Sequence, residues 1–335
     1  MTVVGIRCDA GARTGVGHLV RCVALAEELV TRGVEVRFLS DLGGVEWAEA
    51  QLTQRGLPWS PPPVDAAGLV AAAADFDALV IDSYTLPPEH SAAVRAAGTP
   101  VLAIVDGDFR GQTADIYVDQ NLDSVVDVDG ALGLAGLDYA LLRSAVRTLR
   151  PATPPVHVDG RTPKVVAFFG GTDAYRAAPE IAVLLAQTGV PFEATIIGAN
   201  ESLRDELHAV VPCEGQRFDI IPPTDDLPKL LAEADLVVSA SGTSTWELLC
   251  LGRPAALVWV VDNQILGYDR MMARGFGAGL GRLGHLGADA VDTLTHLLTD
   301  AAARTELARK GWSAVDGRGV ERVADALLAT VPSPR

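Results

Sequence analysis

The sequence has no long apolar run and few cysteines, and each shortage excludes a class of protein. No window of about 18 unbroken apolar residues occurs in the chain, so we expect no membrane insertion. Met1 leads directly into "TVVGI" without a basic segment, so we expect no secretory signal and a cytoplasmic location. The four cysteines form no CxxC pair and no cluster with histidine at zinc spacing, which favours buried reduced thiols and no metal site.

Positive charge is scarce as well. The chain has 27 lysines and arginines against 43 aspartates and glutamates, which gives a net charge of -16. A surface that binds nucleic acid needs a clustered basic face, and an anionic membrane repels an acidic protein, so we expect neither partner. A few local arginines are still enough to hold a small phosphorylated ligand.

Apolar strands alternate with amphipathic helices in both halves of the chain. "TVVGIRCDA" is typical of a buried strand and "HLVRCVALAEELVTRG" of a helix, and the alternation continues to "ADIYVDQNL". The stretch "RTLRPATPPVHVDGRTP" has four prolines and little periodicity, and the alternation restarts at "KVVAFFGG". We therefore predict an α/β protein with two Rossmann-like domains, at 1–150 and 164–318, joined by a linker at 151–163. The ligand is expected in a cleft outside the carboxyl ends of the strands.

The first glycine turn delivers a histidine to the start of a helix. In "DAGARTGVGHLVRC" the turn Gly15-Val16-Gly17 follows the first predicted strand, and His18 comes next. Helix entrances usually carry Ser, Thr, Asp or Asn, so a histidine is unusual there. The positive end of a helix disfavours imidazolium, which leaves a neutral ring that can accept a proton. We predict that His18 is a general base, with helix capping or packing in the turn as the structural alternative.

Two other chemistries have weaker support. A dinucleotide site requires the pattern GxGxxG, but Val20 stands where the third glycine belongs. The "DGD" at Asp106 to Asp108 resembles the DxD of metal-dependent sugar transferases. That motif is short and no third ligand accompanies it, so we interpret it as a loop after a strand.

Polar turns also follow the strands predicted in the second half. "VVAFFGGTD" and "VVSASGTSTWELL" each end an apolar strand in glycines and hydroxyls, whose amides and side chains suit a diphosphate. The nucleotide-binding residues predicted there are Gly170, Gly171, Thr172, Ser241, Gly242, Thr243, Ser244, Thr245 and Glu247. Tight turns are the structural alternative, and Ser244-x-x-Glu247 fits a capping box. "WVVDNQ" ends the next strand in Asp262, Asn263 and Gln264, which indicates either hydrogen bonding to a polar ligand or a simple turn.

These motifs occur in the order of a known family. "RCDAGARTGVGHLVRCVALAEEL", "VIDSY", "YVDQNL", "LDYALLR", "FFGGTD", "SASGTSTWELLCLGRP" and "VVDNQ" resemble PseG, the nucleotide-sugar hydrolase of pseudaminic acid biosynthesis, and the related spore-coat polysaccharide protein SpsG. The resemblance runs from Arg7 to Gln264. The family is similar to GT-B glycosyltransferases of the MurG type, which implies two Rossmann-like domains in GT-B arrangement with an interdomain cleft. The final helix, 319–335, is then expected to pack back on the first domain.

The resemblance also implies a chemistry and a set of site residues. In the family, a UDP-linked diacetamido-trideoxy sugar is hydrolysed at its anomeric carbon and UDP is released, and no metal or cofactor is implied. His18 corresponds to the base for water, and Gly242 to Glu247 correspond to the segment that holds UDP and its ribose. The predicted substrate-binding residues are Gly15, Gly17, Arg21, Asp82, Tyr84, Asn263 and Gln264.

The predicted function is therefore hydrolysis of a nucleotide-activated, UDP-linked amino or deoxy sugar. The alternative is an inverting GT-B glycosyltransferase, in which a small soluble acceptor replaces water. A third class, a nucleotide-sugar binding protein without catalysis, does not explain His18. The sequence leaves water and acceptor open, because both need one base and one open cleft.

Overall fold

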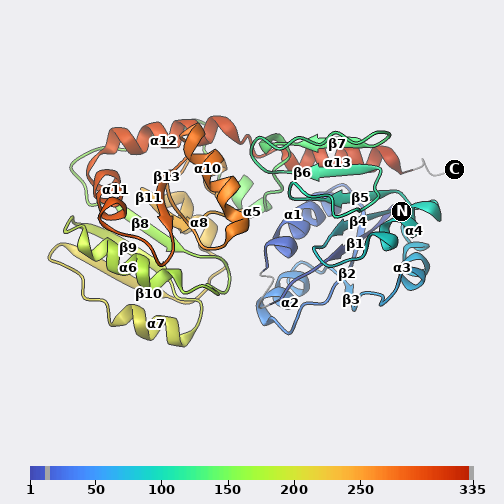
Figure 1. Ribbon diagram of the computed structural model, residues 1–335, viewed down its shortest axis with the longest axis horizontal. Coiled ribbons are helices and arrows are strands. Elements are labelled where there is room, and N and C mark those ends of the chain that lie inside the picture. The colour runs from blue at the N-terminus through green and yellow to red at the C-terminus, as the bar shows by residue number, and fades with distance from the viewer. Residues whose placement is uncertain (12–15, 332–335) are drawn as a thin grey trace. The chain divides into compact units, whose positions relative to one another are not determined.

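The computed structural model describes residues 1–11 and 16–331, which divide into two compact units. One unit comprises Met1–Ser144 together with Gly317–Arg335, and the other comprises Ala145–Asp316. Each unit is built on its own parallel sheet covered by helices (Figure 1). The predicted α/β class with two Rossmann-like domains is confirmed.

The first unit contains a seven-stranded sheet in the order β3-β2-β1-β4-β5-β6-β7. Its strands are β1 (Val3–Cys8), β2 (Glu35–Leu39), β3 (Trp59–Ser60), β4 (Ala78–Asp82), β5 (Val101–Ile104), β6 (Ile116–Asp119) and β7 (Leu132–Ala135). Its helices are α1 (Gly17–Thr31), α2 (Glu46–Thr53), α3 (Ala66–Ala73), α4 (Pro88–Ala96), the short 3-10 helix η1 (Leu137–Tyr139) and α13 (Gly319–Thr330). The strand order reverses between β1 and β4. The carboxyl ends of these two strands are therefore the switch point at which open α/β sheets bind ligands.

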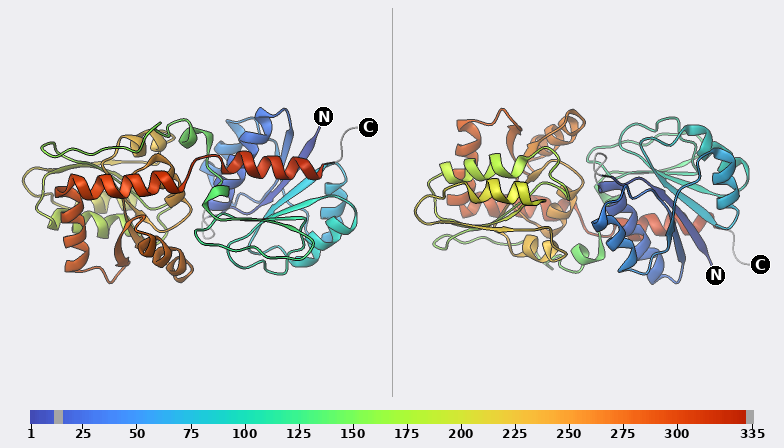
Figure 2. Two further views of the ribbon diagram at one scale, coloured as in Figure 1. Left: turned by 90° about the horizontal axis from the view of Figure 1, so that it is seen from above. Right: turned by 90° about the horizontal axis from the view of Figure 1, so that it is seen from below.

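The sheet of the first unit separates two apolar cores. Val4 and Ile6 of β1 are fully buried and pack with residues of α1 on one face. Leu327 of α13 belongs to the same core, so the last helix of the chain lies beside the first one (Figure 2). Leu79 and Ile81 of β4 face the other side of the sheet and pack with α3 and α4. This alternation of faces fixes the direction of each side chain where the strands end.

The second unit contains a six-stranded parallel sheet in the order β10-β9-β8-β11-β12-β13. Its strands are β8 (Lys164–Phe168), β9 (Phe192–Ile197), β10 (Gln216–Ile221), β11 (Leu236–Ala240), β12 (Ala255–Trp259) and β13 (Ala278–Arg282). Its helices are α5 (Ser144–Arg147), which begins at the division, then α6 (Ala177–Gln187), α7 (Glu201–His208), α8 (Leu227–Glu233), α9 (Ser244–Leu251), the 3-10 helix η2 (Asp262–Gln264), α10 (Ile265–Arg274), α11 (Ala288–Thr299) and α12 (Ala301–Ala314). The order reverses between β8 and β11, which places the switch point of this unit at their carboxyl ends.

Within the described ranges, no helix combines the length and the apolar character that crossing a bilayer requires.

Candidate active site

The switch point of the first unit carries the predicted base. His18 is the second residue of α1 and directly follows Gly17, the first. The N-cap residue Val16 makes no side-chain hydrogen bond to the helix. The His18 ring instead reaches the sheet, where its Nδ1 lies 2.5 Å from Oδ1 of Asp82, the last residue of β4. The histidine therefore does not act as a helix cap. Gly15 lies outside the described residues.

The contact between His18 and Asp82 determines which ring nitrogen carries a proton. A distance of 2.5 Å between Nδ1 and a carboxylate oxygen requires a hydrogen between them, so Nδ1–H donates to Oδ1. Nη2 of Arg21 also lies 3.3 Å from Nδ1, but it makes a shorter bond of 2.6 Å to the same carboxylate oxygen. In the neutral ring the lone pair then belongs to Nε2. His18 is arranged to accept a proton at that atom.

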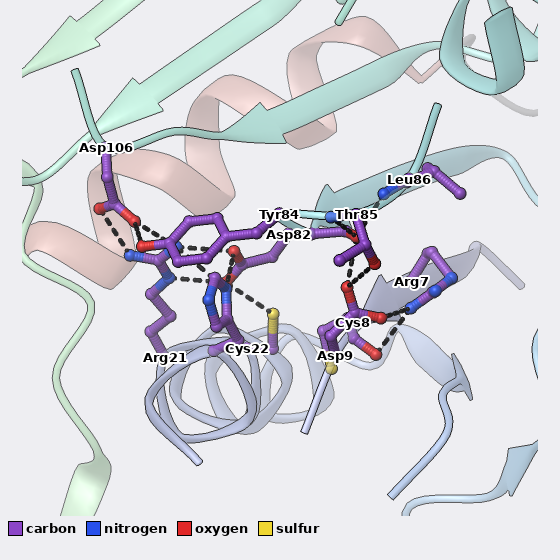
Figure 3. Close-up of polar contacts among 12 residues, drawn as sticks. Arg7, Cys8, Asp9, Arg21, Cys22, Asp82, Tyr84, Thr85, Leu86 and Asp106 are labelled. Atoms are coloured by element: carbon purple, nitrogen blue, oxygen red, sulfur yellow. Dashed lines mark hydrogen bonds and ion pairs between the residues drawn. The ribbon is translucent and has the colours of Figure 1, made fainter. Parts of the chain in front are cut away.

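Asp82 is fully buried and still ionised. Burial favours a raised pKa, but the charge of Arg21 and the hydrogen bonds from Arg21 and His18 outweigh it and lower the pKa of Asp82. Arg21 lies one turn after His18 on α1 and donates from Nε to Oδ2 and from Nη2 to Oδ1, each at 2.6 Å. The Cys22 thiol donates to Oδ2 at 3.5 Å. These donors hold the carboxylate in one orientation (Figure 3).

A second carboxylate, Asp106, extends this network beyond β5. Arg21 donates to it from Nη1 at 2.9 Å, and the Tyr84 hydroxyl donates to it at 2.5 Å (Figure 3). Burial opposes ionisation, but Arg21 and the neighbouring donors hold the pKa of Asp106 well below its usual range. Burial and the nearby Asp106 charge raise the pKa of Tyr84, so its hydroxyl stays protonated. The Tyr84 ring lies edge-on to the His18 ring, with the centroids 4.2 Å apart.

The "DGD" segment is organised by these contacts. Asp108 accepts a hydrogen bond from the backbone amide of Arg110 at 2.8 Å, while Asp106 binds Arg21 and Tyr84. Among residues 1–11 and 16–331, no three His, Cys, Asp or Glu side chains are placed to hold a metal ion together. Asp106 to Asp108 lie between the end of β5 and the start of β6, so the interpretation of this segment as a loop after a strand is confirmed.

Two members of the network, Asn121 and Asp119, were not predicted from the sequence. Nδ2 of Asn121 donates to Asp119 at 2.8 Å and to Asp106 at 3.1 Å. Asp119 is the last residue of β6 and also accepts from the Gly107 amide at 2.8 Å, which anchors the loop after β5. The sequence feature that could have identified them is the polar ending of "YVDQNL", which is the same type of strand end as "VIDSY".

Two loops lie at the switch point of the second unit, and the one after β8 begins with residues that have no charged side chain. Gly170, Gly171 and Thr172 come one residue after the end of β8, and Gly170 has a left-handed backbone with φ of 72°. Asp173 accepts hydrogen bonds from the amides of Ala177 and Ala178, at 2.8 and 3.0 Å, in the first turn of α6. The glycine turn therefore has a helix start beside it, capped by a residue that we did not single out from the sequence.

The second turn lies after β11, and the predicted capping box there is wrong. Helix α9 begins at Ser244, so Ser244 is inside the helix, and the N-cap residue is Thr243. Thr243 makes no side-chain capping bond. Glu247 lies in the first turn of α9 and is 5% exposed. A reciprocal cap with Ser244 thus does not explain this glutamate, because the helix starts one residue earlier than the motif requires.

The loop after β12 meets the turn after β11. Oε1 of Gln264 accepts a hydrogen bond from the Val260 amide at 2.9 Å, which fixes the orientation of the side-chain amide. Its Nε2 group consequently lies near Gly242, where a Cβ atom would be 3.9 Å from it. Asn263 is exposed in η2. The structure therefore brings Gln264 and Gly242 together, with N–H donors on the side of the glycine turn.

Comparisons with known proteins show which sequences and folds this chain is similar to. No family model matches the chain. The spore coat polysaccharide biosynthesis protein SpsG of Bacillus subtilis is 24% identical over 97% of this chain and 97% of that protein. The UDP-N-acetylglucosamine--N-acetylmuramyl-(pentapeptide) pyrophosphoryl-undecaprenol N-acetylglucosamine transferase of Bradyrhizobium diazoefficiens is 29% identical over 74% of this chain and 76% of that protein.

Solved structures agree on the architecture. MurG of Acinetobacter baumannii has a TM-score of 0.74 at 18% identity, over 98% of this chain and 100% of that one. The UDP-GlcNAc 2-epimerase of Neisseria meningitidis, bound to UDP-GlcNAc, has a TM-score of 0.65 at 15% identity, over 98% of this chain and 100% of that one. The end-to-end match to SpsG confirms the resemblance that the ordered motifs indicated. The chain is an SpsG-like enzyme with the two-domain GT-B fold of the MurG-type glycosyltransferases.

Proposed function

We propose that the chain transfers a sugar from a nucleotide-activated donor, a UDP-linked sugar, to the hydroxyl of a small acceptor. One observation carries the proposal: a buried, ionised Asp82 fixes His18 so that Nε2 is the basic nitrogen. The name of the Bradyrhizobium relative, a UDP-N-acetylglucosamine transferase, supports transfer rather than hydrolysis. The structural neighbour with bound UDP-GlcNAc supports a nucleotide sugar as the donor.

The first unit supplies the base. His18 takes the proton of the acceptor hydroxyl at Nε2 as the acceptor oxygen attacks the anomeric carbon. Asp82 stabilises the imidazolium that forms, and Arg21 keeps the carboxylate ionised and aligned. Arg21 and Asp82 were predicted to bind substrate, but their polar atoms bind each other, so we assign them a positioning role. Tyr84, edge-on to His18 and 42% exposed, remains a candidate for sugar contact.

The second unit supplies the groups that bind the donor. As the new bond to the acceptor forms, the bond from the anomeric carbon to phosphate breaks, and the diphosphate leaves with the electron pair. Backbone amides at Gly170 to Thr172 and at Gly242 to Ser244, together with Nε2 of Gln264, are the donors proposed to stabilise it. The Ser241 and Thr245 amides bond to the carbonyls of Val258 and Gly242, so these two residues are proposed to contribute only their hydroxyls. Glu247 is proposed to bind the ribose hydroxyls. A single displacement of this kind inverts the anomeric carbon.

Hydrolysis is the second candidate, and the ordered PseG-like motifs favour it. Water would then replace the acceptor, while His18 and the donor site would act as described above. The test is to measure UDP release from a panel of UDP sugars, with and without a small-molecule extract of cells. Transfer predicts release that depends on the extract. Free reducing sugar that forms in buffer alone, at the same rate as with the extract, would assign the chain to the hydrolases.

A further inference from the structure

The loop between β5 and β6 holds an arginine on an unfavourable backbone. Arg110 has a φ of 49°, and its neighbour Gly111 has a φ of 68°. The left-handed region is unfavourable for a residue with a Cβ atom, so the surroundings must hold Arg110 there. Its amide donates to Asp108 at 2.8 Å, and Nε2 of Gln112 donates to the carbonyl of Leu86 at 2.7 Å. The second bond ties this loop to the segment that carries Tyr84.

The guanidinium of Arg110 stacks on the aromatic ring that contacts the candidate base. Cζ of Arg110 lies 3.8 Å from the centroid of the Tyr84 ring, and the same ring lies edge-on to His18 at 4.2 Å. Cation and base are therefore separated by one aromatic side chain. Tyr84 is itself held by its hydrogen bond to Asp106, so the stack has a fixed support.

The charge of Arg110 is not consumed by a carboxylate. Arg21 is paired with both Asp82 and Asp106, and Arg7 is paired with Asp9. Across residues 1–11 and 16–331, no ion pair of the Arg110 side chain occurs, and Asp108 is engaged by the Arg110 backbone amide. Arg110 is half-buried, so its guanidinium still meets solvent. A stacked guanidinium presents N–H donors in a fork that matches the two oxygens of a carboxylate or the oxygens of a phosphate.

We propose that Arg110, stacked on Tyr84, binds an anionic group of the acceptor, a carboxylate or a phosphate. This inference rests on the proposed function, because the base must contact the acceptor hydroxyl and Arg110 lies one ring away from that base. The acceptor class is then a hydroxylated compound that carries a negative charge near the reacting hydroxyl. A neutral acceptor would leave the Arg110 guanidinium without an anionic partner, because the nearby carboxylates of Asp82 and Asp106 are both paired with Arg21.

The experiment measures acceptor binding without any donor. Titration calorimetry compares glucuronate with glucose, a pair that differs at one carboxylate, and adds glucose 6-phosphate as the phosphate probe. We expect the wild type to bind the two anionic sugars about tenfold more tightly than glucose, as one charged hydrogen-bonded pair provides. Arg110→Ala should abolish this preference, and Arg110→Lys should restore part of it. Arg217→Ala, which removes the same charge from β10 of the other unit, should leave it unchanged.

The same variants show whether the anionic group that Arg110 binds belongs to the acceptor or to the donor. UDP affinity is measured in parallel, and we expect Arg110→Ala to leave it unchanged. A loss of UDP affinity without a loss of the glucuronate preference would assign Arg110 to the donor diphosphate and overturn the proposal. A wild type that binds glucose and glucuronate equally would overturn it too. If no nucleotide sugar binds or turns over while the anion preference persists, the proposed function fails and the anion site stands.

Discussion

The two units share a topology and differ in what stands at their switch points. In the first unit, β4 ends in Asp82, which lies in one buried hydrogen-bonded network with His18 and Arg21 of α1. All three side chains are charged or ionisable. In the second unit, the corresponding ends of β8 and β11 are followed by glycines and hydroxyls, such as Gly170 and Ser241. Proton transfer needs ionised groups in a fixed orientation, which requires burial and paired charge. Binding a diphosphate needs backbone amides that a ligand can approach, which requires small residues.

This difference predicts that damage to the first unit reduces turnover and damage to the second reduces nucleotide affinity. The largest effect is expected from His18→Ala. Loss of a positioned general base costs about 100- to 10,000-fold in rate. UDP release should fall by that factor, while UDP affinity measured by calorimetry stays within about twofold, a change too small to signal a lost hydrogen bond. A folded variant with a wild-type rate would remove His18 from the mechanism.

A somewhat smaller loss is expected from Asp82→Asn. The amide nitrogen can donate to Nδ1 of His18, which moves the ring proton to Nε2 and blocks the basic atom. We expect a fall of about 100-fold in turnover. Asp106→Asn is the matched control, because it also removes one of the two carboxylates of Arg21 but does not touch Nδ1 of His18. Equal losses in the two variants would mean that Asp82 acts only through Arg21.

The second unit is tested by Glu247→Gln. Removing the charge from this buried carboxylate should weaken UDP binding by about tenfold, since a hydrogen bond to a charged group is stronger than one to a neutral group. The melting temperature should change little, because Gln keeps the size of the side chain. Turnover at saturating donor should stay near the wild-type value. An unchanged affinity for UDP with normal stability would return Glu247 to a structural role.

The smallest effect is expected in acid stability. The pKa of Asp106 in the folded state lies below its pKa in the unfolded chain, which is about 4. Its ion pair with Arg21 therefore stabilises the fold fully above about pH 4, and this stability is lost as the pH falls below that value. Asp106→Asn should therefore be less stable than the wild type at pH 7, and the difference in unfolding free energy should shrink between pH 4 and pH 3. Urea unfolding at these pH values measures it. A difference that grows in acid would contradict the assignment.

The sequence predicted the fold because the periodicity of strands and helices is local. It also predicted that His18 follows the end of the first strand, since the glycine turn between strand and helix is a local feature. The role of Arg21 could not be read in this way. Its partner Asp82 lies 61 positions away and meets it only because β4 lies beside β1. The capping box at Ser244 failed for a different reason: the motif does not specify at which residue the helix begins, and α9 includes Ser244.

The proposed reaction is a single displacement at the anomeric carbon, served by one base in the first unit. The most direct measurement is the anomeric configuration of the first-formed product, followed by proton NMR in the presence of EDTA with a turnover-competent UDP sugar. One base and one displacement predict inversion of the donor's configuration, at a rate that EDTA leaves unchanged and that His18→Ala lowers by about 100-fold or more. Retention of configuration, or strict dependence on added magnesium or manganese, would contradict a metal-independent single displacement.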